Sequence, residues 1–132
     1  MKSYRNFFYL FFLFLFCSTI GFAQKTKNKA PSKYEFQGPF CDGLAKVRLN
    51  KKWGFIDSTG GVVVSPKYNE VGNFSDGLAR VRKGQKWGLI DTSGKEIIRP
   101  MFDWIYDFEN GKAKVKSDGA EGYIDRYGNL VK

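Results

Sequence analysis

The stretch Lys52-Trp53-Gly54-Phe55-Ile56-Asp57 decides the fold, because it returns as Lys86-Trp87-Gly88-Leu89-Ile90-Asp91 and, in a more divergent form, as Glu121-Gly122-Tyr123-Ile124-Asp125. Successive copies are 34 residues apart. The flanking Phe-x-x-Gly segments keep the same period, and they begin at Phe40, Phe74 and Phe108. A period of this length is the signature of an array in which each repeat is one supersecondary unit. The sequence therefore predicts a repeat protein.

Local patterns within each copy favour β-strands. Apolar and basic residues alternate in Ala45-Lys46-Val47-Arg48, and alternation with period two indicates a half-buried strand. The Trp-Gly stretch is expected to form a second strand. The third, Val62-Val63-Val64, is expected to end before Pro66, because proline cannot donate to a strand ladder. We expect an all-β fold: an array of about three 34-residue β-meander repeats, with about three antiparallel strands per unit and the last unit truncated. A partly closed barrel, an open array and propeller-like blades are all compatible with this pattern.

Glycine and aspartate recur at fixed places in the repeat. A glycine inside a strand costs stability, so Gly54 implies either a bend in the backbone or a neighbouring group packed where a side chain would lie. The segment Asp57-Ser58-Thr59-Gly60 has the residues that a type I turn prefers at its first and fourth positions. Calcium loops use several acidic oxygens, whereas this turn offers one acidic residue. We expect turns here and no metal.

The connector between units carries spaced aromatic and apolar residues, in Tyr68–Phe74 and more densely in Phe102–Phe108. Large rings at such places usually fill the gap between stacked units, so we expect these rings to be packing residues. In the last unit, Lys112 and Glu121 replace the leucine and the tryptophan of the earlier copies. Terminal repeats of an array are atypical, and we interpret these polar substitutions as a cap.

Residues 1–23 have the composition of a secretory signal peptide. Lys2 and Arg5 precede an almost continuous run of Phe and Leu, and small residues at Gly21 and Ala23 predict cleavage after Ala23. Retention of the segment as a membrane anchor is the alternative, although the apolar stretch is slightly shorter than the roughly 20 residues that span a bilayer. We expect a secreted or periplasmic location, with membrane contact only through this segment before cleavage.

The remainder divides into a short basic segment and the repeat domain. The formal net charge of the chain is +9, but it falls to +3 for residues 34–132, which hold 16 basic and 13 acidic side chains. Residues 24–33 are therefore interpreted as a basic flexible linker, and nucleic acid is not expected as a partner. The predicted boundaries are a partial unit at 34–39 and units at 40–73, 74–107 and 108–132.

The combination of Phe-x-Asp-Gly-Leu-Ala-x-Val, Lys-Trp-Gly-Phe-Ile-Asp-x-x-Gly and Pro-x-Tyr resembles the bacterial WG repeat, named for its tryptophan–glycine pair. The likeness extends from Tyr34 to Lys132 and departs from the pattern at Glu121, where the tryptophan is missing. The resemblance implies a β-rich repeat module that is common in bacteria, often secreted and without an assigned biochemical activity. It supplies no catalytic residue that could be transferred to this chain.

The sequence offers little support for catalysis. It contains no histidine, the commonest general base and metal ligand. The three aspartates Asp57, Asp91 and Asp125 are equivalent positions of one turn, which explains their recurrence without catalysis. We expect no enzyme and no cofactor.

A binding or scaffolding role is the leading hypothesis: a secreted, non-catalytic repeat module with a protein or a cell-envelope glycan as its partner. Trp53, Trp87 and Tyr123 are the candidate ligand-contacting aromatics if the face that they share is open, whereas a module this small also needs large rings for its core. The alternative is a purely structural repeat that self-associates through exposed sheet edges.

Overall fold

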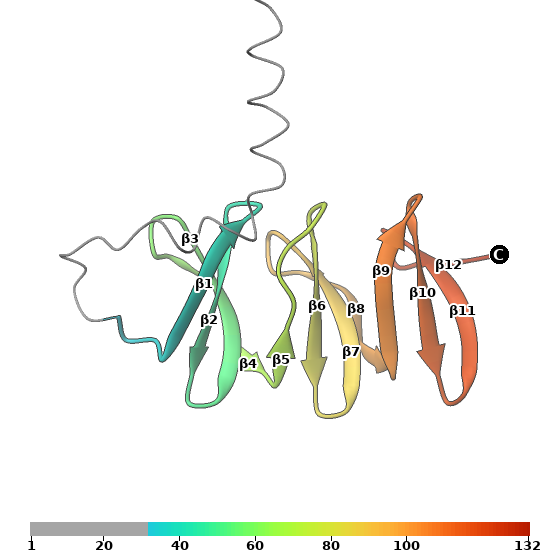
Figure 1. Ribbon diagram of the computed structural model, residues 1–132, viewed down its shortest axis with the longest axis horizontal. Helices are drawn as coiled ribbons and strands as arrows, with labels where there is room; N and C mark the ends of the chain where they lie inside the picture. The colour runs from blue at the N-terminus through green and yellow to red at the C-terminus, as the bar shows by residue number, and fades with distance from the viewer. Residues whose placement is uncertain (1–31) are drawn as a thin grey trace, which may run out of the picture.

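The computed structural model describes residues 32–132, which fold into three antiparallel sheets of four strands each (Figure 1). The predicted signal peptide and residues 24–31 of the predicted linker lie outside the described residues. Within residues 32–132 no helix has the length and apolar character needed to cross a membrane. The first sheet consists of β1 (Phe36–Cys41), β2 (Leu44–Leu49), β3 (Lys52–Asp57) and β4 (Val62–Tyr68). The second consists of β5 (Glu70–Val71), β6 (Leu78–Lys83), β7 (Lys86–Asp91) and β8 (Glu96–Phe102). The third consists of β9 (Trp104–Glu109), β10 (Lys112–Ser117), β11 (Ala120–Asp125) and β12 (Leu130–Val131).

Each sheet is a meander whose strands follow chain order, so the predicted all-β array of antiparallel meander repeats is confirmed. Figure 1 shows the sheets side by side in a row, from β1–β4 at one end to β9–β12 at the other. Among the architectures that the sequence left open, the described part of the chain adopts the open array.

Each sheet has four strands, whereas the sequence predicted about three per unit. The additional strand comes from the connector, which pairs with the next sheet instead of crossing between sheets as a loop. Glu70–Val71 pairs with β6, and Trp104–Glu109 pairs with β10. The connector can pair in this way because its apolar side chains, such as Val71 and Ile105, enter the cores between sheets.

The prediction that the third strand ends before its proline is wrong, since β4 continues through Pro66 to Tyr68. In the ladder Trp53 lies opposite Tyr68 and Phe55 lies opposite Val64, so residues 65–67 bulge opposite a single glycine. A bulged residue makes no ladder hydrogen bond, and proline is therefore tolerated there.

This bulge explains the glycine of the Trp-Gly pair. A Cβ atom built on Gly54 would meet the carbonyl oxygen of Val64 and would lie 2.7 Å from the nitrogen of Pro66. At Gly88 the equivalent contacts are the carbonyl oxygen of Ile98 and, at 2.8 Å, the nitrogen of Pro100. The group that occupies the place of the missing side chain is thus the backbone of the next strand in the same sheet.

Two hydrophobic cores join the three sheets. The first core combines Phe55 and Tyr68 of the first sheet with Val81 and Ile90 of the second, and each of these four side chains is at most 1 % exposed. The second core joins the second and third sheets, and its buried members are Trp87, Leu89, Ile98, Ile105, Ala113, Val115 and Ile124. Full burial of each large apolar side chain stabilises the fold by about 1.5–3 kcal/mol. The sheets are therefore held to one another mainly by these cores.

Hydrogen bonds between sheets fix how the sheets are placed. The Tyr68 hydroxyl donates to Oε1 of Glu96 in the second sheet at 2.6 Å. The Gly77 amide donates to Oδ2 of Asp42 at 2.9 Å, which connects the turn before β2 with the turn before β6. Because these bonds have partners in different sheets, they restrict sliding in a way that apolar contacts do not.

The recurring aspartates close turns, as the sequence predicted. The Gly60 amide donates to the Asp57 carbonyl at 3.0 Å, and the Asp57 carboxylate accepts from the amides of Thr59 and Gly61. Side-chain hydrogen bonds, first among them those from Thr59 to Asp57 and from Ser93 to Asp91, hold the pKa values of these two carboxyls below their usual range. The same effect lowers the pKa of Asp125, mainly through Asn129.

We expect these turns to make the stability of the protein depend on pH. A carboxyl whose pKa is lower in the folded state binds fewer protons there, so its contribution is present at neutral pH and is lost as the pH falls below about 4. Urea denaturation followed by tryptophan fluorescence from neutral to acidic pH measures this decline. The triple change of Asp57, Asp91 and Asp125 to Asn should lower stability at neutral pH and flatten the acid decline. An unchanged decline in the triple variant would contradict the assignment.

Candidate functional site: a cleft between the second and third sheets

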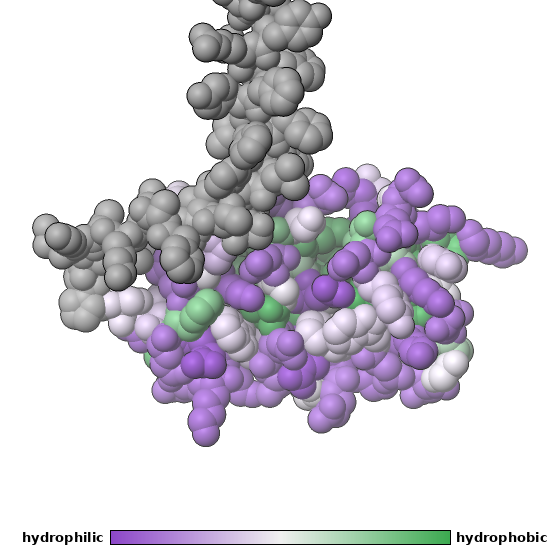
Figure 2. Space-filling view, in the orientation of Figure 1, coloured by the Kyte–Doolittle hydropathy of each residue, from purple (hydrophilic) through white to green (hydrophobic). Residues whose placement is uncertain are grey.

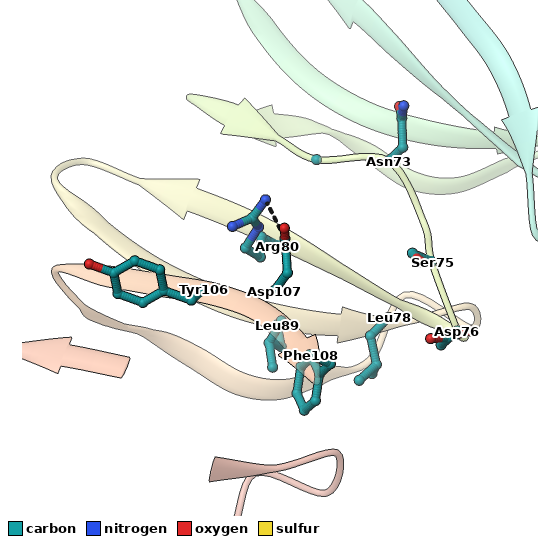
Figure 3. Close-up of a pocket in the computed structure, with 10 residues that line it drawn as sticks. Asn73, Ser75, Asp76, Leu78, Arg80, Leu89, Tyr106, Asp107 and Phe108 are labelled. Carbon is teal, nitrogen blue, oxygen red and sulfur yellow. Dashed lines mark ion pairs between the residues drawn. The ribbon is translucent and has the colours of Figure 1, made fainter. Parts of the chain in front are cut away.

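A cleft of about 150 Å³ lies between the second and third sheets (Figure 3). Its walls come from three segments: the turn that leads into β6, the facing surfaces of β6 and β7, and the edge strand β9. The residues that line it are Gly72, Asn73, Ser75, Asp76, Leu78, Arg80, Leu89, Tyr106, Asp107 and Phe108.

The cleft forms where the edge strand of the second sheet is interrupted. After the two residues of β5, the Gly72 amide still donates to the Arg80 carbonyl at 2.8 Å, and the next contact with β6 is the bridge between Ser75 and Leu78. Between these points Phe74 is buried in the first core, and Asn73 lines the cleft (Figure 3). The edge strands β1 and β9 each have six residues, so this interruption is specific to the second sheet.

Arg80 connects the two sides of the cleft. Its Nη1 donates to the carbonyl of Ile105 at 2.7 Å, and its Nη2 forms an ion pair with Oδ1 of Asp107 at 3.2 Å. The guanidinium also lies 5.5 Å from the centre of the Trp104 ring, within the range of a cation–π contact. Since all three partners belong to β9, Arg80 fixes the edge of the third sheet relative to the second.

Polar groups beside this bridge remain available for a ligand. Within residues 32–132 the side chains of Asn73, Ser75 and Asp76 make no hydrogen bond or ion pair. Tyr106, which is 40 % exposed, lies at the other end of the cleft, beyond Arg80 and Asp107 (Figure 3). Polar groups together with an exposed aromatic ring are typical of a small-molecule or glycan site.

The aromatic residues predicted from the sequence lie in three different sheets. Trp87 belongs to the second core and is only 7 % exposed, whereas Trp53 is half-buried against the first core. Tyr123 is 43 % exposed on the far side of the third sheet. None of the three lines the cleft.

Sequence reasoning missed two exposed rings, Trp104 and Tyr106. Their exposed fractions are 39 % and 40 %, so neither ring is confined to the gap between units, although Trp104 does pack on Trp87 of the second sheet as expected. The Trp104 ring makes an edge-to-face contact with the Trp87 ring, with 5.1 Å between the ring centres. Ile105, which lies between Trp104 and Tyr106 in the sequence, is fully buried. The signal in the sequence is this alternation, because successive strand residues point to opposite faces. Figure 2 shows pale side chains of intermediate hydropathy over β7 and β9, among hydrophilic ones.

The repeat, the buried Trp-Gly strands and the bulges that cover their glycines agree with a comparison against protein families. The family described as WG containing repeat matches residues 26–53, 53–87 and 87–119. The chain belongs to this WG repeat family. No curated protein and no solved structure matches the chain.

The WG repeat boundaries clarify what one unit encloses. The matches meet at Trp53 and Trp87, so the unit 53–87 contributes strands to both the first and the second sheet and holds most of the first core. The unit 87–119 likewise holds most of the second core and one wall of the cleft. In this WG repeat protein the repeating element is therefore an interface between sheets.

Proposed function

We propose that this WG repeat protein is a secreted, non-catalytic binding module whose inter-sheet cleft and neighbouring aromatic rings hold a cell-envelope glycan. The observation that carries the proposal is a cleft with unbonded side chains, those of Asn73, Ser75 and Asp76, at one end and the exposed Tyr106 ring at the other (Figure 3). Sugars present apolar C–H groups on their ring faces and hydroxyls at their edges. A phenol ring suits the former, and carboxylate, amide and hydroxyl groups suit the latter.

A protein partner is the other occupant that the cleft admits, since peptide groups also pair with amides and hydroxyls. The bacterial and extracytoplasmic setting is supported by the leader sequence, with cleavage after Ala23, and by the family resemblance. Both kinds of partner are met outside the cytoplasm. The glycan is preferred because the wall of the cleft is a flat ring.

The side chains at the cleft favour binding over catalysis. Its charged pair, Arg80 and Asp107, connects two sheets, and Arg80 is also held by the carbonyl of Ile105. Among residues 32–132 no group of three His, Cys, Asp or Glu side chains is placed to hold a metal ion. The proposal therefore assigns ligand binding to the side chains of the cleft themselves.

Self-association as a purely structural repeat is less well supported. At the free side of the third sheet, Lys112 and Glu121 stand where the earlier units have leucine and tryptophan, and burying charges against another sheet is costly. Arg80 also donates a hydrogen bond to the Ile105 carbonyl on the edge strand β9, so this carbonyl is not available for pairing with another strand. Light scattering that found stable oligomers at low concentration would favour the structural alternative.

We expect purified protein to be retained on gels that contain cell-envelope glycan, and Tyr106→Ala to weaken that retention by about tenfold, the equivalent of about 1.4 kcal/mol. The double variant Asn73→Ala, Ser75→Ala should weaken retention as well, because the glycan loses the amide and hydroxyl groups with which it pairs. Tyr127→Ala is the matched control, since this tyrosine is 73 % exposed and does not line the cleft. Equal retention of the Tyr106 and Tyr127 variants would contradict the proposal.

A further inference from the structure

The edge of the third sheet beside β11 is paired over a shorter stretch than the same edge of the other two sheets. In the first sheet β4 has seven residues, and its last residue, Tyr68, lies opposite Trp53. β8 has the same length and pairs with β7 in the same way. β12 has two residues, and within residues 32–132 no residue lies opposite Glu121 on this side. The backbone between Ala120 and Gly122 is therefore an open strand edge, which can pair with another strand.

Gly122 keeps the glycine that a bulged neighbouring strand requires. A Cβ atom built on Gly54 would lie 2.7 Å from the nitrogen of Pro66, and one built on Gly88 would lie 2.8 Å from the nitrogen of Pro100. At Gly122 the only neighbour within 4 Å among the described residues is a methyl group of Val115. A strand glycine costs stability unless its missing side chain makes room for something. The third sheet thus has the space that a proline-bearing strand fills in the other two.

The same edge leaves an aromatic ring uncovered. Tyr123 of β11 is 43 % exposed, whereas its equivalents Phe55 and Leu89 are each 1 % exposed. Part of the cover in the first sheet comes from Tyr68, the aromatic residue that follows the proline and packs in the same core as Phe55. An aromatic residue at the equivalent place of an added strand would lie beside Tyr123.

β12 is held by few contacts. Its two residues pair only with Tyr123 and Ile124, and the side chain of Leu130 is 75 % exposed. The turn before it is closed by hydrogen bonds to Asp125, which do not depend on β12. A longer strand can therefore replace β12 and pair along β11 as β8 pairs along β7.

We propose that this edge binds an extended segment of a partner protein, which becomes the outer strand of the third sheet. The two filled edges define the chemistry of the segment, because both carry an apolar residue, a proline two residues later and an aromatic residue two residues after the proline. These stretches are Val64-Ser65-Pro66-Lys67-Tyr68 and Ile98-Arg99-Pro100-Met101-Phe102. Strand addition of this kind takes its affinity from main-chain hydrogen bonds and its specificity from alternate side chains.

The segment would occupy the edge in the register of β8. There the apolar Ile98 lies opposite Leu89, the proline lies in the bulge beside the glycine, and Phe102 lies opposite Trp87. On β11 the corresponding partners are Tyr123, Gly122 and Glu121. None of these three lines the cleft, so this inference does not depend on the glycan function proposed for the cleft.

The test uses the purified protein and a synthetic peptide of residues 95–103, which is this chain's own β8 with one residue on each side. Calorimetric titration should show binding of this peptide and no binding of a peptide with the same residues in scrambled order. Gly122→Ala should weaken binding by about tenfold or more, because the new methyl group would meet the bulge of the added strand. Urea denaturation should show that this variant is no less stable than the unchanged protein, so the loss does not reflect unfolding.

Gly38→Ala is the matched control. It makes the same change on β1, where the new Cβ atom would meet the flexible side chain of Lys46, and it should bind the peptide as the unchanged protein does. The ring contact has its own test, because Tyr123→Ala should weaken binding of the peptide more than binding of the same peptide with Phe102→Ala.

Four results would overturn the inference. Binding that is unchanged in Gly122→Ala would place the peptide elsewhere, and equal binding of the scrambled peptide would remove the sequence pattern. Equal effects of Tyr123→Ala on the two peptides would contradict the register. Dimers that light scattering detects and that Gly122→Ala dissociates would show that a second copy of the chain takes the edge. Retention on glycan gels is a separate measurement, so the proposed function stands or fails without regard to these outcomes.

Discussion

Replacing Gly88 by alanine is expected to lower the free energy of unfolding by about 3 kcal/mol, whereas the same change at Gly122 is expected to raise it by about 0.5–1 kcal/mol. At Gly88 the new methyl group would meet the backbone of the bulged strand, with the nitrogen of Pro100 at 2.8 Å. Backbone held by a ladder and a proline cannot move aside easily. Gly54 has the same surroundings and should respond as Gly88 does.

Gly122 provides the matched control, because it is the glycine of the third Trp-Gly position. A Cβ atom there would meet only a methyl group of Val115, at 4.0 Å, since β12 pairs only with Tyr123 and Ile124. Alanine then removes the conformational freedom of glycine in the unfolded chain without a clash. Chemical denaturation of the three single variants gives the signs directly. If alanine destabilises position 122 as much as position 88, the bulge is not the reason for the glycine.

Tyr68→Ala is expected to cost about 3–5 kcal/mol, because it removes a fully buried ring from the first core. A large part of the protein's total stability, which for a domain of this kind is about 5–15 kcal/mol, would be lost with one side chain. Burial, together with the hydrogen bond to Glu96, raises the pKa of the Tyr68 hydroxyl, so the group stays neutral at physiological pH and donates. Differential scanning calorimetry should show a lower melting temperature at all neutral pH values.

Removing only the hydroxyl separates packing from hydrogen bonding. Tyr68→Phe is expected to cost about 1–2 kcal/mol, since it leaves the Glu96 carboxylate without its partner. Tyr34 is the control: it is the repeat equivalent of Tyr68, and its buried hydroxyl has no hydrogen-bond partner among residues 32–132. The residue equivalent to Glu96 is Val62, which offers no acceptor. Tyr34→Phe should therefore leave stability unchanged or raise it slightly, and a loss equal to that of Tyr68→Phe would contradict the role of Glu96.

The repeat could be predicted from the sequence because its period survives without insertion between Trp53 and Trp87. Alternation identified the strands of each hairpin for a similar reason: it reflects burial on one face, which local sequence records. The fourth strand and the passage of β4 through Pro66 could not be predicted in this way. Both depend on what the neighbouring strand leaves open, and the rule that proline ends a strand holds only where a ladder bond is needed.

The candidate site was harder to predict than the fold. The cleft exists because Phe74 enters the first core and the chain near Asn73 leaves the ladder, and only the weak strand formers Gly72 and Asn73 hint at this. The exposed rings of β9 were visible as an alternation, but the fold was needed to say which of its faces is open. Lys112 could be recognised as a cap residue from its place in the repeat, whereas its ladder partners Glu109 and Asp125 become its neighbours only in the folded sheet.

The polar end of the third sheet has a consequence for how such a protein changes its length. A middle sheet presents apolar residues on both sides, as the second sheet does with Val81 and Leu89. Duplication of a segment such as residues 74–107 would therefore insert a new sheet that fits between existing ones, and both ends would be unaffected. Addition beyond the third sheet would instead have to bury Lys112 and Glu121. Gene duplication can thus lengthen this array from its interior, because an inserted sheet would meet apolar faces on both sides.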